Sequence, residues 1–92
     1  MNVIGFYRVE HTALSLSMRL MDEFPNIKLT RKKNFDCNPG FPSNEYPFML
    51  ILESGASIEE CKKIHSSHFA RFKYDKNYRM KYDLSNLYYK GY

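Results

Sequence analysis

Hydrophobic and polar residues follow two rhythms along this chain, and each rhythm predicts one kind of element. Residues 2–9, "NVIGFYRV", are branched and aromatic on both sides, which is typical of a central strand. Residues 12–24 place their apolar side chains on one broad arc at helical period. Thr12 stands where the N-cap of that helix is expected, and Pro25 stands where the helix must end.

Two further strands are predicted on either side of a long loop. Residues 27–35 alternate as a half-exposed strand does. Its apolar side comprises Ile27, Leu29 and Phe35, and its polar side comprises Lys28, Thr30, Lys32 and Asn34. Residues 36–46 contain two prolines and a glycine and predict a loop that is functional or mobile. Residues 47–54, "PFMLILES", form the most apolar segment, which we expect at the centre of the sheet.

A second helix is predicted over residues 57–70. Ser57 and Glu60 have the spacing of a capping box, in which the hydroxyl and the carboxylate each bond a free backbone N–H group. The segment that follows, residues 71–84, reads "RFKYDKNYRMKYDL" and alternates between aromatic and charged residues. This alternation predicts one long strand, or a hairpin that turns near Asp75 through a three-residue loop.

The succession of strand, helix, strand, strand, helix and strand predicts an α+β fold. It fits a split βαβ (ferredoxin-like) sandwich, with two helices on one face of an antiparallel sheet. The last strand is either a single strand or a C-terminal hairpin, and residues 1–92 form a single domain. The order is similar to that of RNA-recognition-motif domains. The segment "FMLILESG" lacks the aromatic run with which those domains stack bases, so the resemblance implies backbone binding by cations only.

The charge of the chain is compatible with a polyanionic partner. Fourteen Lys and Arg residues against ten Asp and Glu give a formal charge of +4. The N-terminal residues show no signal peptide, and the longest apolar run is too short to span a bilayer. We therefore expect a cytoplasmic protein, without a membrane partner, whose two cysteines, Cys37 and Cys61, are reduced.

The alternating segment offers the main candidate binding surface. In a three-residue hairpin, cations would face cations across the two strands, and an anionic ligand such as a phosphate would relieve that repulsion. A neighbouring strand would extend the cationic face with two lysines. The predicted nucleic-acid-binding residues are Lys28, Lys32, Arg71, Lys73, Arg79 and Lys81. The alternative interpretation is a solvated sheet face whose lysines prevent aggregation at the sheet edge.

Cys61, His65 and His68 share one face of the second predicted helix. They could hold zinc with a fourth ligand, for which the candidates are His11, Asp36 and Cys37. The favoured interpretation is that they are core residues, with the histidines hydrogen-bonded to buried tyrosine hydroxyls. On this interpretation the protein has no metal site and no cofactor.

An enzymatic role is not favoured by the sequence. His65 and His68 could act as the acid and base of RNA cleavage only if both opened onto one cleft, whereas the helical wheel points them inward. The chain has no glycine-rich phosphate loop and no G-x-S-x-G motif. We expect a non-enzymatic binder of nucleic acid, with RNA favoured, and keep a small nuclease as a third alternative.

The chain also resembles the small accessory proteins of large virulent tailed phages, because it is short, basic and rich in Tyr and Lys. That resemblance implies a host-directed role, such as inhibition of a toxin or defence system through an RNA or a host protein. The second hypothesis is accordingly a protein-interaction module that uses the 36–46 loop and the tail tyrosines Tyr88, Tyr89 and Tyr92. A homodimer formed through the edge of the 71–84 segment is a further alternative.

Overall fold

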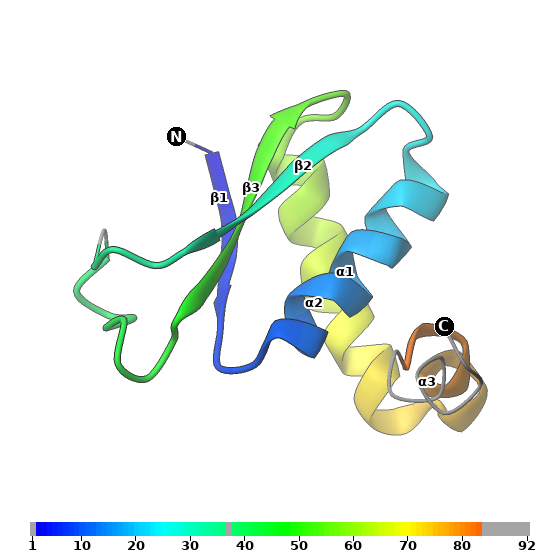
Figure 1. The fold of residues 1–92 in the computed structure, drawn as a ribbon. Helices are drawn as coiled ribbons and strands as arrows, with labels where there is room; N and C mark the ends of the chain where they lie inside the picture. The colour runs from blue at the N-terminus through cyan, green and yellow to red at the C-terminus, as the bar shows by residue number, and fades with distance from the viewer. Residues whose placement is uncertain (1, 37, 84–92) are drawn as a thin grey trace, which may run out of the picture.

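The computed structural model describes residues 2–36 and 38–83, and these form three strands and three helices (Figure 1). The elements in chain order are β1 (Asn2–Tyr7), α1 (Glu10–Glu23), β2 (Lys28–Lys33), β3 (Phe48–Ser54), α2 (Ile58–Tyr74) and α3 (Lys76–Tyr82). The predicted α+β class is confirmed. In the described part of the chain, each helix is too short or too polar to cross a membrane.

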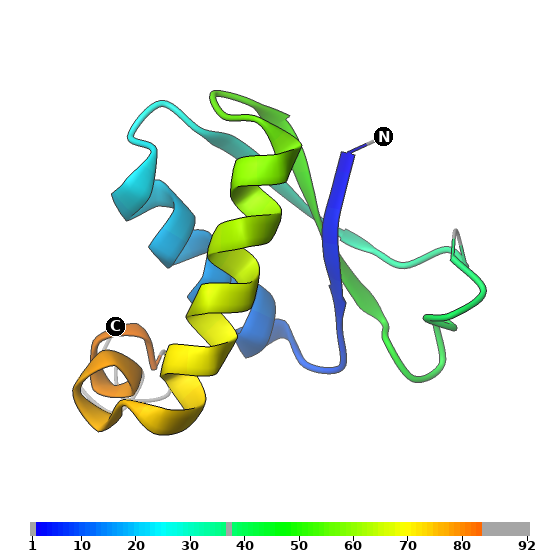
Figure 2. The ribbon, with the colours of Figure 1, turned by 180° about the vertical axis from the view of Figure 1, so that it is seen from behind.

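The three strands form one antiparallel sheet in the order β1-β3-β2, with the apolar strand β3 in the centre as predicted. Both long helices cover the same face of this sheet (Figures 1 and 2). The core lies between these layers, where Leu50 and Leu52 of β3 pack against Leu16 and Leu20 of α1. The predicted arrangement of two helices on one face of an antiparallel sheet is thus confirmed.

The opposite face of the sheet is also apolar along its middle. Met49 and Ile51 of β3 point away from the helices and are buried. Met49 is paired with Phe6 of β1, and the ring of Phe41 stacks on Phe6 with centroids 4.9 Å apart. The loop between β2 and β3 therefore covers part of the second face, and a solvated cationic surface does not extend across it.

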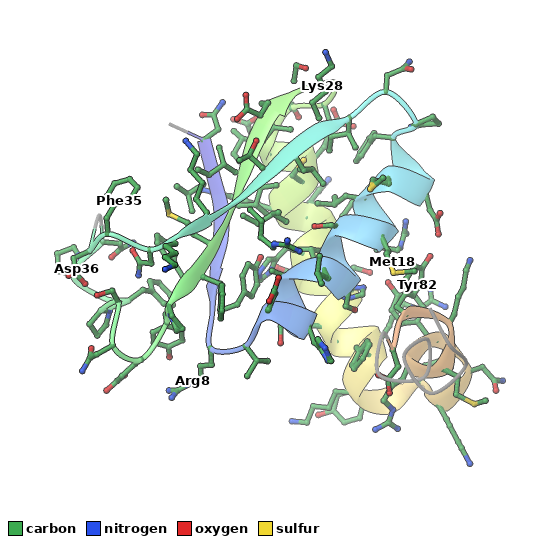
Figure 3. All side chains as sticks on the ribbon, viewed as in Figure 1. Arg8, Met18, Lys28, Phe35, Asp36 and Tyr82 are labelled. Atoms are coloured by element: carbon green, nitrogen blue, oxygen red, sulfur yellow. The ribbon has the colours of Figure 1, made fainter. Side chains whose placement is uncertain are left out.

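The 34–47 loop is organised by Asn34, which was predicted on the polar side of a strand. Asn34 is buried, and its side-chain amide donates hydrogen bonds to the carbonyl oxygens of Phe41 (2.7 Å) and Tyr46 (2.9 Å). Because β2 ends at Lys33, the next residues leave the alternation of the strand. Phe35, predicted on the apolar side, is instead 59% exposed at the end of the molecule opposite the helices (Figure 3).

The two long helices begin differently. The predicted N-cap of α2 is confirmed, because Ser57 Oγ accepts from the Glu60 backbone N–H at 3.2 Å. The Glu60 carboxylate accepts from the Ser57 hydroxyl at 3.0 Å, whereas the predicted capping box has it bond the Ser57 backbone N–H. The N-cap predicted at Thr12 is wrong: the N-cap is Val9, three residues earlier, and it makes no side-chain hydrogen bond. At its other end α1 closes at Glu23, just before Pro25 as predicted.

The strand or hairpin predicted over residues 71–84 is wrong. α2 continues to Tyr74, Asp75 caps the next helix by accepting from the Tyr78 backbone N–H at 3.1 Å, and α3 runs to Tyr82. The physical reason is a second pattern in the same residues. Tyr78 and Tyr82 lie one helical turn apart and are both buried, so the helical period buries these rings without a further strand.

The fold prediction is consequently confirmed only in its coarser part. The first three strands and both long helices follow the expected order, but the ferredoxin-like sandwich also needs a fourth strand, and residues 71–82 are helical. The predicted cationic hairpin face and the hairpin edge through which a dimer was considered both required that fourth strand, so neither is present in residues 71–83. The tyrosines predicted at positions 88, 89 and 92 lie outside the described residues, as does Cys37.

Candidate nucleic-acid interface

Four of the six predicted phosphate-binding cations lie on the last turn of α2 and on α3, and the junction of these helices lies beyond the end of the sheet (Figure 2). Asp75 fixes this junction. Its carboxylate caps α3 and forms an ion pair with Arg71, at 3.5 Å between Nη2 and Oδ2. The hydrogen bond from the Tyr78 backbone, together with Arg71, lowers the pKa of Asp75, so this carboxylate is charged at neutral pH.

We call the exposed part of this junction the basic corner. It consists of Arg71, Lys73, Tyr74, Lys76, Arg79 and Lys81. Its most unusual member is Tyr74, whose side chain packs against no core and is 80% exposed. Lys73 Nζ stands 5.3 Å from the centre of the Tyr74 ring, within cation–π distance. The basic corner thus combines an open aromatic ring with cations on consecutive turns.

The cations of the basic corner are not equally available to a ligand. Arg71 is engaged by Asp75 and lies over the Tyr78 ring, 4.2 Å from its centre. Lys81 lies 3.9 Å from the Asp22 carboxylate of α1. Within residues 2–36 and 38–83, Lys73, Lys76 and Arg79 form no ion pair. These three cations are free to contact phosphates.

A groove of about 470 Å³ separates α1 from the basic corner. Arg19, Arg71 and Lys81 line it, but so do the carboxylates of Asp22 and Glu23. Arg19 is held by Glu23 at 2.7 Å. Since the groove carries both signs of charge, a phosphate would compete there with internal carboxylates. The outer surface of the corner is the better anion site.

The other two predicted cations lie elsewhere. Lys28 and Lys32 belong to β2, at the far edge of the sheet from β1. Figure 3 shows Lys28 near one end of the molecule and Tyr82, beside the basic corner, near the other. The prediction of one sheet face that carries all six cations is wrong, because the residues that were to form the neighbouring strand are helical.

His68 lies in the core as the favoured interpretation predicted. It is 1% exposed, and its two ring nitrogens lie 3.0 Å from Ser15 Oγ and 2.7 Å from Tyr78 Oη. Burial, with smaller contributions from Arg19 and His65, lowers the pKa of His68 to about 4. A neutral imidazole therefore joins α1, α2 and α3 through one hydrogen-bonded chain.

His65 lies one turn earlier on α2, in different surroundings. Its ring is half-buried beside Tyr7 of β1, with ring centroids 5.9 Å apart, and burial lowers its pKa. The two histidines thus do not open onto one cleft, which the nuclease alternative required. Cys61 is fully buried, and burial raises the pKa of its thiol. Among the described residues, no group of three His, Cys, Asp or Glu residues could hold a metal ion.

Sequence reasoning missed the two residues that make the basic corner most distinctive. The alternating pattern assigned Tyr74 to the buried aromatic side and left Lys76 in a turn. A helical reading contains the missing signal: His68, Phe72, Tyr78 and Tyr82 are spaced to line the inner sides of two helices. Tyr74 fits the alternation but not the helical period, and a large aromatic left out in this way must face solvent.

The chain matches no protein family, no curated protein and no solved structure.

Proposed function

We propose that this protein is a non-enzymatic nucleic-acid-binding protein that binds single-stranded RNA through the basic corner. The observation that carries the proposal is the ring of Tyr74, which is 80% exposed beside Lys73 and precedes Lys76 and Arg79 by two and five residues. Single-stranded nucleic acid offers phosphates to cations and unstacked bases to aromatic rings. A duplex would leave Tyr74 without a base to stack on, so single strands are favoured.

The binding surface differs from the one expected from sequence, although four of its residues are the same. Phosphate contacts are assigned to Lys73, Lys76 and Arg79, with Arg71 and Lys81 as flanking charges. Lys28 and Lys32 are too far round the molecule to contact the same short segment. If the chain is a phage accessory protein, as its composition suggested, the ligand would be a host RNA whose site the protein occupies.

The test is a salt series with two variants of equal charge. Binding of labelled single-stranded RNA and duplex DNA is measured from about 50 to 200 mM salt, where several phosphate contacts weaken affinity by orders of magnitude. Lys73→Glu/Arg79→Glu should abolish RNA binding in a folded protein. Lys28→Glu/Lys32→Glu changes the net charge by the same amount and should retain most of the affinity.

Two results would contradict the proposal. Equal losses in the two double variants would mean that net charge alone attracts RNA, and unchanged affinity in Lys73→Glu/Arg79→Glu would exclude the basic corner. Tyr74→Ala isolates the stacking contribution, because it removes no charge. We expect about a tenfold loss for single-stranded RNA or more, as stacking on one ring contributes about 1–3 kcal/mol, and little change for duplex DNA.

A second candidate function is a protein-interaction module that uses the 34–47 loop. Phe35 is 59% exposed there, next to Asn34, whose side-chain amide donates to the carbonyl oxygens of Phe41 and Tyr46. An exposed aromatic beside such a fixed residue is typical of an anchor at a protein interface. Tight, salt-insensitive binding to one host protein, lost in Phe35→Ser and retained in Tyr74→Ala, would favour this function over RNA binding.

A further inference from the structure

The outer edge of β1 contains a local irregularity centred on Gly5. The pairing with β3 shifts by one residue between Val3 and Gly5, as at a β-bulge. A β-carbon at position 5 would stand 2.5 Å from Tyr7 Oη and 2.8 Å from His65 Nε2, closer than atoms can approach without movement. Two polar atoms from different elements therefore converge on backbone that carries no side chain.

The Tyr7 hydroxyl, one of these two groups, lacks a hydrogen-bond partner in the described part of the chain. Tyr7 is 4% exposed, so its hydroxyl is also shielded from water. Buried polar groups nearly always have a partner, since an unpaired one loses its bonds to water without replacement. Such a group in a native protein calls for an explanation, and a site for an external partner is one.

A cavity of about 400 Å³ opens beside the same glycine. It is lined by Gly5 and Phe6 of β1, by Lys62 and His65 of α2, and by Asn38 and Phe41 of the 34–47 loop. The lining is apolar at the stacked rings of Phe6 and Phe41 and polar at the α2 wall. A concave site with a few convergent polar groups is the usual form of a small-molecule pocket.

We propose that this cavity binds a small organic anion with a flat apolar body. The apolar body lies against Phe6 and Phe41, and the anionic oxygens lie beside Gly5 between Lys62 Nζ and His65 Nε2. The Tyr7 hydroxyl is buried next to His65 Nε2, so binding includes a small rotation of the His65 ring that lets the hydroxyl donate as well. The anion can be a carboxylate or a phosphate ester, and both supply the acceptors that these donors need.

The chemistry of the α2 wall agrees with this ligand class. Burial lowers the pKa of His65, so its neutral ring can donate a single hydrogen bond but carries no charge. Burial also raises the pKa of Tyr7, which keeps its hydroxyl protonated and able to donate. Lys62 supplies the positive charge. This site lies on β1 and the first half of α2 and shares no residue with the basic corner.

The test is a titration followed by amide NMR with three probes: phenyl phosphate, benzoate and the neutral benzyl alcohol. We expect saturable shifts at Gly5, Lys62 and His65 with one or both anions below about 10 mM, a range that covers millimolar affinity. Comparison of the two anions distinguishes a phosphate site from a carboxylate site. No saturable shift at these residues with either anion, or equal binding of benzyl alcohol, would overturn the proposal.

Variants of the wall sharpen the result. Lys62→Gln should weaken anion binding several-fold, whereas Lys63→Gln, the same change on the neighbouring exposed residue, should not. Gly5→Ala should abolish binding because its β-carbon displaces Tyr7 Oη and His65 Nε2. Tyr7→Phe is the decisive second variant because it leaves the fold intact, and we expect roughly fivefold weaker binding from the loss of one hydrogen bond. Wild-type affinity in both Lys62→Gln and Tyr7→Phe would exclude the proposed anion contacts.

Discussion

Two histidines one turn apart on α2 have opposite surroundings. His68 meets a hydroxyl at each ring nitrogen, and it and the two side chains it joins, those of Ser15 and Tyr78, are all buried. His65 stands beside a buried hydroxyl, that of Tyr7, which has no partner in the described part of the chain. Each place pairs a histidine with a buried tyrosine, but only the His68 network is complete in its hydrogen bonding.

The difference separates a structural site from a candidate binding site. A complete network fixes how α1, α2 and α3 pack and needs nothing from outside. An incomplete one beside a cavity lowers the stability of the empty protein, and a ligand that completes it would restore that stability. Substitutions that remove polar atoms should therefore destabilise the protein strongly at the His68 network, and should cost little or add stability beside His65.

The largest expected effect is that of His68→Leu. The substitution keeps a similar volume but leaves the hydroxyls of Ser15 and Tyr78 buried without partners, for which we expect a loss of about 3 kcal/mol in the free energy of unfolding. The matched change His65→Leu removes no hydrogen bond from the described network and should cost less than about 1 kcal/mol. Urea denaturation at pH 7 measures both, and equal losses would abolish the distinction.

Acid should act mainly through His68. Its pKa is about 4 in the folded protein and near 6.5 when unfolded, so between these values the unfolded chain binds the additional proton. Stability is therefore complete above about pH 6.5 and falls as the pH drops toward 4, by about 3 kcal/mol from this one group.

Carboxylates also titrate over part of that range, so the measured quantity is the difference between two proteins. The pH dependence of the free energy of unfolding in wild type, minus that in His68→Leu, isolates the histidine. His65, whose pKa is lowered in the same direction, should contribute a smaller slope. Identical slopes in wild type and His68→Leu would show that His68 does not stay neutral in the folded protein.

The two tyrosines give the sharpest contrast, because the same substitution should change stability in opposite directions. Tyr78→Phe removes one partner of His68 and should lower the free energy of unfolding by about 1–2 kcal/mol. Tyr7→Phe removes an unpaired buried hydroxyl and should raise it by about 1 kcal/mol. Thermal midpoints suffice to read the sign. A loss in Tyr7→Phe would mean that its hydroxyl already has a partner in solution.

Much of the fold could be predicted from local patterns. The strong apolar run of β3, the amphipathic period of α1 and the capping box of α2 each specify one element, and all three are found. The strand predicted over residues 71–84 was wrong because residues 71–82 fit both the strand period and the helical period. Which period prevails depends on the neighbouring surface, and Tyr82 decides it by donating to Asp22 of α1 at 2.8 Å, a contact between residues sixty positions apart.

The candidate sites were predictable to different degrees. The helical wheel alone identified His68 as an inward residue. A buried tyrosine hydroxyl was predicted as its hydrogen-bond partner, but the sequence did not indicate that this tyrosine is Tyr78. The cavity at Gly5 could not be anticipated, because it depends on a register shift in β1 and on the packing of α2 over that point. In the sequence, a glycine within a strand indicates a bulge or a close approach of another group, but it does not identify that group.

The smallest expected effect concerns the cap that begins α2. Ser57→Ala removes the hydrogen bond to the Glu60 backbone and should cost about 1 kcal/mol. Eleven residues, about 16 Å along the helix axis, separate it from His68, so the two should act independently. The double variant Ser57→Ala/His68→Leu should equal the sum of the single losses to within about 0.5 kcal/mol, with the pH dependence of His68→Leu unchanged. A larger discrepancy would mean that the histidine network depends on the stability of the whole helix. The contrast between His65 and His68 would then result from their positions along α2 and less from their hydrogen-bond partners.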